Sequence, residues 1–372
     1  MKVLIAGDFC PQNRVAALFD EGEFGSVLQN IRDVVSTADY SIVNFECPVV
    51  TREAKPIIKI GPNLKCSESG IKAIKWAGFN CVTLANNHFY DFGEEGVKCT
   101  LETCTKLGID TVGGGNNLAE ASKILYKQIN SKIIAIVNCC EHEFSIATDK
   151  TGGSNPLNPI QQYYAIKEAK TKADYVFVIV HGGHEHWQLP SLRMVETYRF
   201  FIDVGADAVV NHHQHCISGY EVYKGKPIFY GLGNFCFDDS QYHNGIWTEG
   251  YAVIINFEFE EPTFQLFPYQ QCTEEPSVKL LPQDAFCEKL KELNSIIVND
   301  HFLKTKVDKY YASCAMQYSD IFEPIRNRFY LGAKRRGWLP SFISKKRKIA
   351  AADYIICEAH RDKMTYWLER IN

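Results

Sequence analysis

Side chains that can bind metal ions follow five short apolar runs of this chain. They are Asp8 after residues 2–6, Glu46 after 41–43, Asn87 and His88 after 81–85, His181 after 176–180, and His213 and His215 after 208–210. Continuous apolar runs are typical of strands that are buried on both faces. Sites in open α/β sheets form beyond the carboxyl ends of the strands. The pattern therefore predicts an α/β fold in which these side chains converge on a metal site.

The predicted donor set mixes carboxylate oxygens with imidazole nitrogens. That mixture suits Zn²⁺, Mn²⁺ or Fe better than Ca²⁺ or Mg²⁺. The candidates are too many for one tetrahedral ion, whereas two divalent cations about 3.5–4 Å apart that share a carboxylate would use them all. Such a pair activates a water molecule and neutralises the anionic transition state of ester hydrolysis.

His88 stands three residues before Asp91. A carboxylate at that spacing can accept the second N–H of the imidazole and so fix its orientation. We therefore predict that His88 is a general acid and that Asp91 orients it.

Several of these residues also fit an ordinary structural role. His181 suits a polar strand end, Asp8 after Gly7 suits a turn, and the pair Asn86-Asn87 is a turn signal. The imidazoles of residues 212–215 are harder to explain by packing, because three in four residues seldom arise that way. Alternate residues of an extended segment point the same way, so His213 and His215 are the expected ligand pair and His212 is the spare.

Four further residues are candidates for contact with the substrate. Arg14 could meet an anionic group, although a solvated surface role is the alternative. Glu185 follows Gly182-Gly183, which allows close approach of a ligand, and a surface loop is the alternative. His212 and Asn234 complete the set, and the segment 234–238 around Asn234 is itself typical of a turn.

Composition excludes several classes of protein. The chain has 372 residues, of which 46% are hydrophobic, and a formal net charge of -4, so nothing points to nucleic acid. We find no signal peptide and no apolar run long enough for a transmembrane anchor, and we expect a cytoplasmic protein. The 14 cysteines form no CxxC pair, which favours free buried thiols over a disulfide framework.

The character of the chain changes near residue 260. We predict a first domain at residues 1–265 and a mostly helical C-terminal appendage at 266–372. The appendage carries basic clusters at 334–336 and 345–348. Such clusters are typical of solvated helix faces, and a binding patch is the alternative.

The ordered motifs resemble a known family. They are Gly7-Asp8, Asn44-Phe45-Glu46-Cys47-Pro48, Ala85-Asn86-Asn87-His88 with Asp91 and Gly93, His181-Gly182-Gly183 with Glu185, His212-His213-Gln214-His215, and Tyr230-Gly231-Leu232-Gly233-Asn234-Phe235. Over about residues 1–260 the sequence is similar to the CapA-type proteins of capsule and poly-γ-glutamate synthesis. That family looks like a branch of the calcineurin-like metallophosphoesterase superfamily.

The resemblance implies a four-layer α/β/β/α metallophosphoesterase-like sandwich with a two-metal site. It implies that Glu46 is the bridging carboxylate, that His88 is the acid beside the substrate, and that the ligands are Asp8, Glu46, Asn87, His181, His213 and His215. The wider superfamily has a metal-binding His two residues after its first Asp, and this chain has Cys10 there. The resemblance therefore leaves two alternatives open: one metal position is weak or empty, or Cys10 is a ligand.

The favoured function is a metal-dependent hydrolase, with a phosphoester as the first choice of substrate and a link to capsule or other surface-polymer biosynthesis. The substrate would be an anionic small molecule or polymer, and proteins of polymer synthesis would be the partners. Two alternatives remain open. One is hydrolysis of a γ-glutamyl amide at the same site, and the other is a non-catalytic accessory subunit of a polymer-synthesis complex.

Overall fold

The first sheet is built around the N-terminal strand. A computed structural model describes residues 1–51, 53–258 and 261–368. The sheet has the order β16-β15-β14-β1-β2-β3-β4, and β13 pairs with the end of β1. Strands β1 to β4 and β13 are parallel, whereas β14 to β16 are antiparallel. The bounds are β1 Lys2–Cys10, β2 Tyr40–Phe45, β3 Cys81–Thr83, β4 Asp110–Val112, β13 Asn234–Phe237, β14 Glu249–Asn256, β15 Thr263–Gln271 and β16 Val278–Leu280.

The second sheet has the order β11-β12-β10-β9-β7-β6. Its inner strands are parallel and its two edge strands are antiparallel. The bounds are β6 Leu125–Ile129, β7 Lys132–Cys140, β9 Tyr175–His181, β10 Ala208–His212, β11 Tyr220–Tyr223 and β12 Lys226–Phe229. A separate pair, β5 (Gly114–Gly115) and β8 (Gly153–Ser154), completes the described strands.

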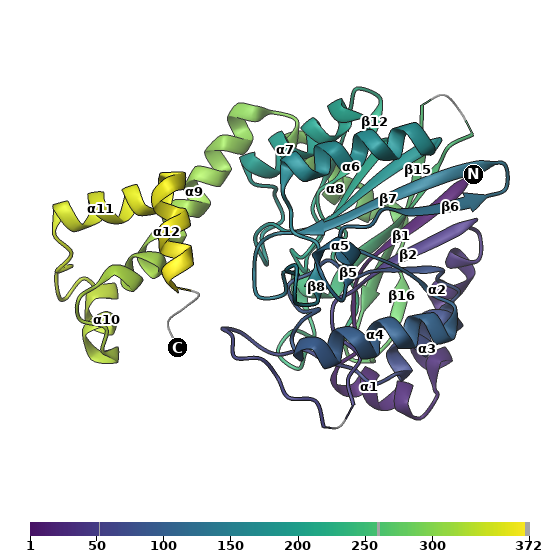
Figure 1. The fold of residues 1–372 in the computed structure, drawn as a ribbon, viewed down its shortest axis with the longest axis horizontal. Coiled ribbons are helices and arrows are strands. Elements are labelled where there is room, and N and C mark those ends of the chain that lie inside the picture. The colour runs from purple at the N-terminus through teal and green to yellow at the C-terminus, as the bar shows by residue number, and fades with distance from the viewer. Residues whose placement is uncertain (52, 259–260, 369–372) are drawn as a thin grey trace. The chain divides into compact units, whose positions relative to one another are not determined.

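The two sheets pack face to face, with helices on the outer faces (Figure 1). On β1, Val3 and Ile5 enter the core between the sheets, while Leu4 and Ala6 face the helices. This alternation explains why the strand is apolar on both faces. The predicted four-layer α/β/β/α sandwich is therefore confirmed. The helices of these layers are α1 Asn13–Asp20, α2 Phe24–Val35, α3 Ser69–Ala77, α4 Gly93–Leu107, α5 Leu118–Ala121, α6 Pro159–Lys172 and α7 Leu192–Val204.

Local signals set the helix ends. Helices α3 and α7 end at Gly78 and Gly205, which have φ of 96° and 135°, a region that favours glycine. Ser191 caps α7 by accepting a hydrogen bond from the N–H of Met194. Helix α3 begins at Ser69, and its cap position is Glu68, whose side chain makes no capping hydrogen bond.

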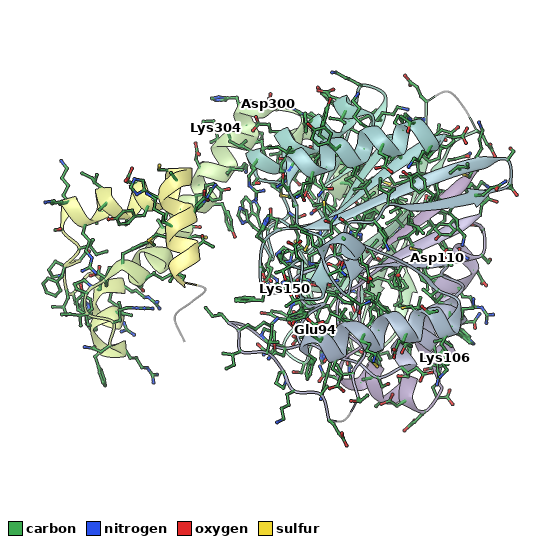
Figure 2. The ribbon with its side chains drawn as sticks, viewed as in Figure 1. Glu94, Lys106, Asp110, Lys150, Asp300 and Lys304 are labelled. Atoms are coloured by element: carbon green, nitrogen blue, oxygen red, sulfur yellow. The ribbon has the colours of Figure 1, made fainter. Side chains whose placement is uncertain are left out.

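Helix α4 carries charges that suit its dipole. Glu94 lies in the first turn and Lys106 in the last turn, and Figure 2 labels both. A carboxylate near the N-terminus and an ammonium near the C-terminus each stabilise a helix.

Contacts divide the chain into a first unit, Met1–Leu303, and a second unit, Lys304–Asn372. The predicted division at residue 265 falls inside β15, and it stays a prediction. Helix α8 (Gln283–Ile297) belongs to the first unit and contacts β11 and β15. The predicted turn at 234–238 is wrong, because residues 234–237 form β13 and pair with β1.

The second unit is helical over its described residues, as the sequence predicted. It contains most of α9 (Asp300–Ser319), α10 (Arg328–Arg335), α11 (Lys345–Ile356) and α12 (Glu358–Leu368), and the short 3-10 helix η2 (Asp320–Phe322). A second 3-10 helix, η1 (Gly245–Thr248), lies in the first unit. Among residues 1–51, 53–258 and 261–368, no helix is both long and apolar enough to cross a membrane.

The cysteines are free thiols. Those that are buried include Cys47, Cys81, Cys104, Cys139 and Cys140. Cys99 and Cys357 are partly exposed. Burial raises the pKa of the buried thiols, for example that of Cys104 to about 12, so these thiols are neutral.

Candidate metal centre

Six predicted ligands converge where the carboxyl ends of the two sheets meet. Two groups of donors form there, and in each group the donor atoms lie within 4.8 Å of one another. One group is Glu46, His181 and His213, and the other is Asp8, Glu46 and His215. Glu46 is the member common to both. The geometry is therefore compatible with two cations on either side of one carboxylate.

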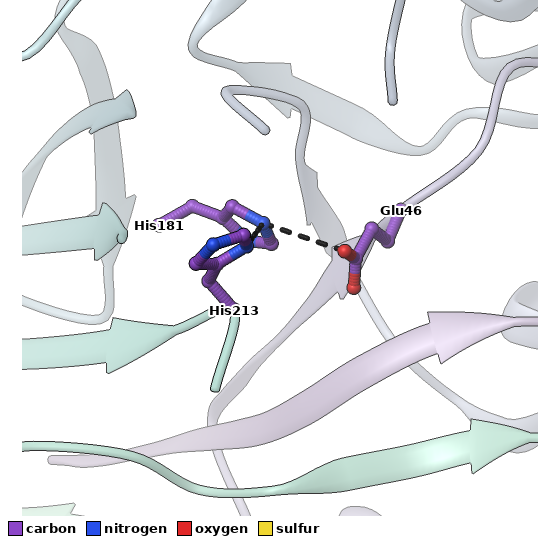
Figure 3. A group of neighbouring side chains, drawn as sticks. All are labelled: Glu46, His181 and His213. Atoms are coloured by element: carbon purple, nitrogen blue, oxygen red, sulfur yellow. Dashed lines mark hydrogen bonds and ion pairs between the residues drawn. The ribbon is translucent and has the colours of Figure 1, made fainter. Parts of the chain in front are cut away.

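The first group is centred on the imidazole of His181 (Figure 3). Its Nε2 lies 3.4 Å from Oε1 of Glu46 and 3.1 Å from Nδ1 of His213. The side-chain oxygen of Asn87 lies 3.0 Å from the same Nε2. Two nitrogens and two oxygens thus face one point, which is a donor set suited to Zn²⁺, Mn²⁺ or Fe.

The second group is centred on His215. Its Nε2 lies 3.5 Å from Oε1 of Glu46, and its Nδ1 lies 3.6 Å from Oδ2 of Asp8. Oδ1 of Asn234 lies 2.9 Å from the Nδ1 of His215. Asn234, predicted to contact substrate, therefore lies behind this imidazole and orients it.

A close backbone approach places Asp8. The register of β1 shifts between Ala6 and Asp8, so Gly7 lies in a bulge. A Cβ on Gly7 would lie 1.9 Å from the carbonyl oxygen of Gly233, and only glycine fits there. The N–H of Asp8 donates to that same carbonyl at 3.1 Å. The bulge thus re-aims Asp8 toward the site.

His213 and His215 lie in a strained loop. Strand β10 ends at His212, and the next ligands have φ of 91° and 53°. Side chains other than glycine seldom adopt this region, and such strain concentrates at functional sites. The sequence predicts that His213 and His215 point the same way because they alternate in an extended segment. That reason is wrong, because a loop of unusual backbone conformation, and not strand alternation, brings the two side chains together.

Glu46 is the strongest sign that a cation belongs here. Its side chain is completely buried, and neither carboxylate oxygen has a hydrogen-bond donor among the described residues. Burial, and then the charge of Asp8, raise the pKa of Glu46 well above its ordinary value. A buried carboxylate without a partner is costly. A divalent cation would supply the missing partner, so the residues fit a metal centre.

The neighbouring groups are already in the state that binds metal. Burial lowers the pKa of His181, and it lowers that of His215 to about 4, so both imidazoles are neutral at pH 7. Burial alone would raise the pKa of Asp8, but the close approach of the His212 imidazole outweighs it and lowers the pKa below its ordinary value. Metal ligands must be deprotonated in this way.

His88 lies against Asp91 as predicted. Nδ1 of His88 is 2.7 Å from Oδ2 of Asp91. The structure adds Lys59, which the sequence reasoning missed. Its Nζ forms an ion pair with Asp91 and lies 3.1 Å from Nδ1 of His88, and its side chain is 2% exposed. A lone lysine in a loop gives no sequence signal of such a role.

Asn44 is a second residue that was missed. Its amide nitrogen donates to Oδ1 of Asp8 at 2.8 Å and lies 3.2 Å from Nδ1 of His181. It thus holds Asp8 of one donor group and His181 of the other. The signal was available, because Asn44 is the first residue of the quoted motif that contains Glu46. Glu143 was also missed, and its Oε2 accepts a hydrogen bond from Asn87 at 3.1 Å.

The remaining candidates lie in different places. The guanidinium of Arg14 donates to both carboxylate oxygens of Asp238 and to the carbonyls of Thr273 and Glu274. These are the contacts of a structural clamp, and a substrate role for Arg14 stays a prediction. Glu185 is exposed, and its charge helps to raise the pKa of Glu46.

His212 and Cys10 are buried beside the ligands. Nδ1 of His212 lies 3.3 Å from Oδ1 of Asp8, so this imidazole supports a ligand from the side. Cys10 belongs to neither donor group of the described residues. Burial raises the pKa of its thiol, and the thiol accepts a hydrogen bond from Gln12 at 3.4 Å.

Comparison with known proteins matches this part of the chain to one family. Residues 2–239 match the model of the bacterial capsule synthesis protein PGA_cap. The chain is 33% identical over 246 residues to the capsule biosynthesis protein CapA of Bacillus anthracis, covering 64% of this chain and 60% of that protein. It is 26% identical over 230 residues to the "Probable polyglutamine synthesis accessory protein Rv0574c" of Mycobacterium tuberculosis (strain ATCC 25618 / H37Rv), covering 57% and 58%.

The matched region spans about 60% of the length of these curated relatives. Among solved structures, a phosphatase of Mycoplasma pneumoniae has a TM-score of 0.47 at 14% identity, over 74% of this chain and 95% of that one.

Proposed function

Because the chain belongs to the bacterial capsule synthesis protein family PGA_cap, we propose that it is a two-metal hydrolase that cleaves a phosphoester in surface-polymer metabolism. The observation that carries the proposal is the position of Glu46 between two groups of donors. Its orphaned oxygens and the neutral imidazoles beside it support binding of two divalent cations.

The first cation would be held by Glu46, Asn87, His181 and His213, and the second by Asp8, Glu46 and His215. Cations of this kind polarise a phosphoryl oxygen and lower the pKa of a water molecule. Asn44 and Asn234 keep the ligands in place, because each contacts a ligand side chain. Removal of such supporting contacts typically costs 10–100-fold in metal affinity or activity.

His88 would move a proton. Asp91 occupies its Nδ1, which leaves Nε2 as the nitrogen that donates to the departing oxygen of the substrate. Lys59 balances the charge of Asp91. Asp91 also accepts a hydrogen bond from the N–H of Leu64 at 2.6 Å, so two contacts hold the loop at 53–65 against Asp91. The constellation thus offers an oriented acid that directly follows the proposed ligand Asn87 in the chain.

Two other functions use the same residues. A γ-glutamyl amide could be the substrate, because the same centre can polarise an amide carbonyl. The chain could instead be an accessory subunit, as the printed name of the Mycobacterium tuberculosis relative says of that protein. The substrate that is cleaved separates ester from amide hydrolysis, and the metal content of the purified protein separates an enzyme from an accessory subunit.

The test compares a panel of phosphoesters with γ-linked glutamyl oligomers, each with Mn²⁺ and with a chelator. We expect chelator-sensitive release of phosphate and no release of glutamate. His213→Ala should abolish the activity, and His360→Ala in the second unit is the matched control. Release of glutamate would assign amide hydrolysis. Failure to retain metal, together with inactivity on both panels, would assign the accessory role.

A further inference from the structure

The second unit is strongly basic. Residues 304–372 contain 15 Lys and Arg and 7 Asp and Glu, a formal charge of +8, whereas the whole chain carries -4. The charge is concentrated in residues 324–349, which contain no Asp or Glu at all. The basic residues of that segment are Arg326, Arg328, Lys334, Arg335, Arg336, Lys345, Lys346, Arg347 and Lys348.

Two carboxylates just before this segment are used internally. Asp320 accepts hydrogen bonds from Lys334 and Arg335, each at 2.8 Å. Glu323 accepts from the hydroxyl of Tyr330 at 3.0 Å and from the N–H of Phe342 at 3.2 Å. These bonds fasten α10 and the segment 337–343 to η2. The other seven basic residues have no ion pair to a carboxylate among the described residues.

Large exposed apolar side chains lie between these Lys and Arg residues in the sequence. Phe329 is 89% exposed and Trp338 is 73% exposed. Both line a hollow of about 400 Å³ together with Arg328 and Arg336. The guanidinium of Arg336 lies 5.4 Å from the centre of the Trp338 ring. Leu339, Phe342 and Ile349 are also exposed. We call residues 326–349 the basic-aromatic segment.

We propose that the basic-aromatic segment binds the surface of an anionic phospholipid membrane. Phe and Trp rings enter the headgroup region of a bilayer, and Lys and Arg beside them pair with lipid phosphates. A soluble polyanion would match the positive charge, but it offers no apolar phase for Phe329 and Trp338. The combination of charge and exposed rings therefore favours a membrane over an acidic polymer.

The test is co-sedimentation of the full-length protein with vesicles. We expect binding to vesicles that contain phosphatidylglycerol and little binding to vesicles of phosphatidylcholine alone. The quadruple variant Lys345→Gln, Lys346→Gln, Arg347→Gln and Lys348→Gln should weaken the partition by about three orders of magnitude. A matched control replaces four exposed lysines of the first unit by Gln: Lys72, Lys98, Lys106 and Lys123. It should bind as the wild type does.

A second set of variants tests the contribution of the exposed rings, and it combines Phe329→Ser with Trp338→Ser. This double variant should lose binding, whereas Trp338→Phe, which keeps an apolar ring, should retain it. Ile160→Ser with Tyr164→Ser removes exposed apolar side chains of α6 and is the control. Hydrogen exchange over the helices of both units shows that each variant is folded. Equal binding to neutral and anionic vesicles, or binding to soluble poly-γ-glutamate but to no vesicle, would overturn the proposal.

Discussion

The side-chain oxygen of Asn234 lies 2.9 Å from Nδ1 of His215, and Nε2 of the same ring lies 3.5 Å from Glu46. Asn234 comes from the start of β13 and His215 from the loop after β10, so the pair joins the two sheets at the site. An amide oxygen at Nδ1 fixes the proton there and leaves the lone pair of Nε2 for a cation.

Asn234→Ala should therefore weaken one of two cation sites. A lost supporting contact typically costs about 10–100-fold in metal affinity. Calorimetric titration with Mn²⁺ should show one weakened and one unchanged site, while the exposed control Asn116→Ala shows two unchanged sites. Two unchanged sites in Asn234→Ala would refute the positioning role.

The buried pair of Lys59 and Asp91 should matter for stability. Lys59→Met leaves a buried carboxylate without its cation, and breaking a buried ion pair typically costs about 3–5 kcal/mol. Urea unfolding measures this loss. Adding Asp91→Asn to Lys59→Met should cost less than the sum of the two single changes, because no unpaired charge remains. Lys55→Met, at an exposed position of the same loop, is the control. A Lys59→Met protein as stable as that control would contradict the assignment.

Arg14 should be important for stability and not for substrate binding. Arg14→Lys loses the two-pronged contact with Asp238 and the bonds to the carbonyls of 273 and 274. We expect a lower Tm and an unchanged KM for any phosphoester that the protein cleaves. A raised KM at an unchanged Tm would return Arg14 to the substrate site.

The outline of the site could be predicted because its ligands follow apolar runs, and the carboxyl ends of parallel strands meet in space. The reason why His213 and His215 come together could not be predicted, because nothing in the sequence indicates a positive φ at two residues that are not glycine. Lys59 was missed for a similar reason. It is 29 residues away from His88 in the sequence, and only the path of a long loop brings the two side chains together. Asn234 was read as part of a turn because a four-residue strand next to glycines has a turn-like composition.

The second unit should lose stability in acid. Burial alone would raise the pKa of Glu323, but its hydrogen bonds with Ser341, Lys334, Tyr330 and the N–H of Phe342 lower it from 4.5 to about 2. The stabilisation is therefore complete above pH 4.5 and is lost as the pH falls toward 2.

Pulsed hydrogen exchange of residues 328–343, labelled at one fixed pH after incubation at pH 7, 4 and 2, measures this loss. Glu323→Gln should reduce protection at pH 7 and flatten its dependence on acid. Asp362→Asn, at an exposed position of α12 in the same unit, provides a comparison. Parallel acid profiles for the wild type and Glu323→Gln would show that Glu323 does not carry the effect.

The most direct test of the central claim is anomalous diffraction from crystals soaked in Mn²⁺. The account predicts two peaks about 3.5–4 Å apart, one on each side of the Glu46 carboxylate. One peak should lie beside His181 and His213, and the other beside Asp8 and His215. A single peak, or no peak within reach of Glu46 in fully soaked crystals, would contradict it.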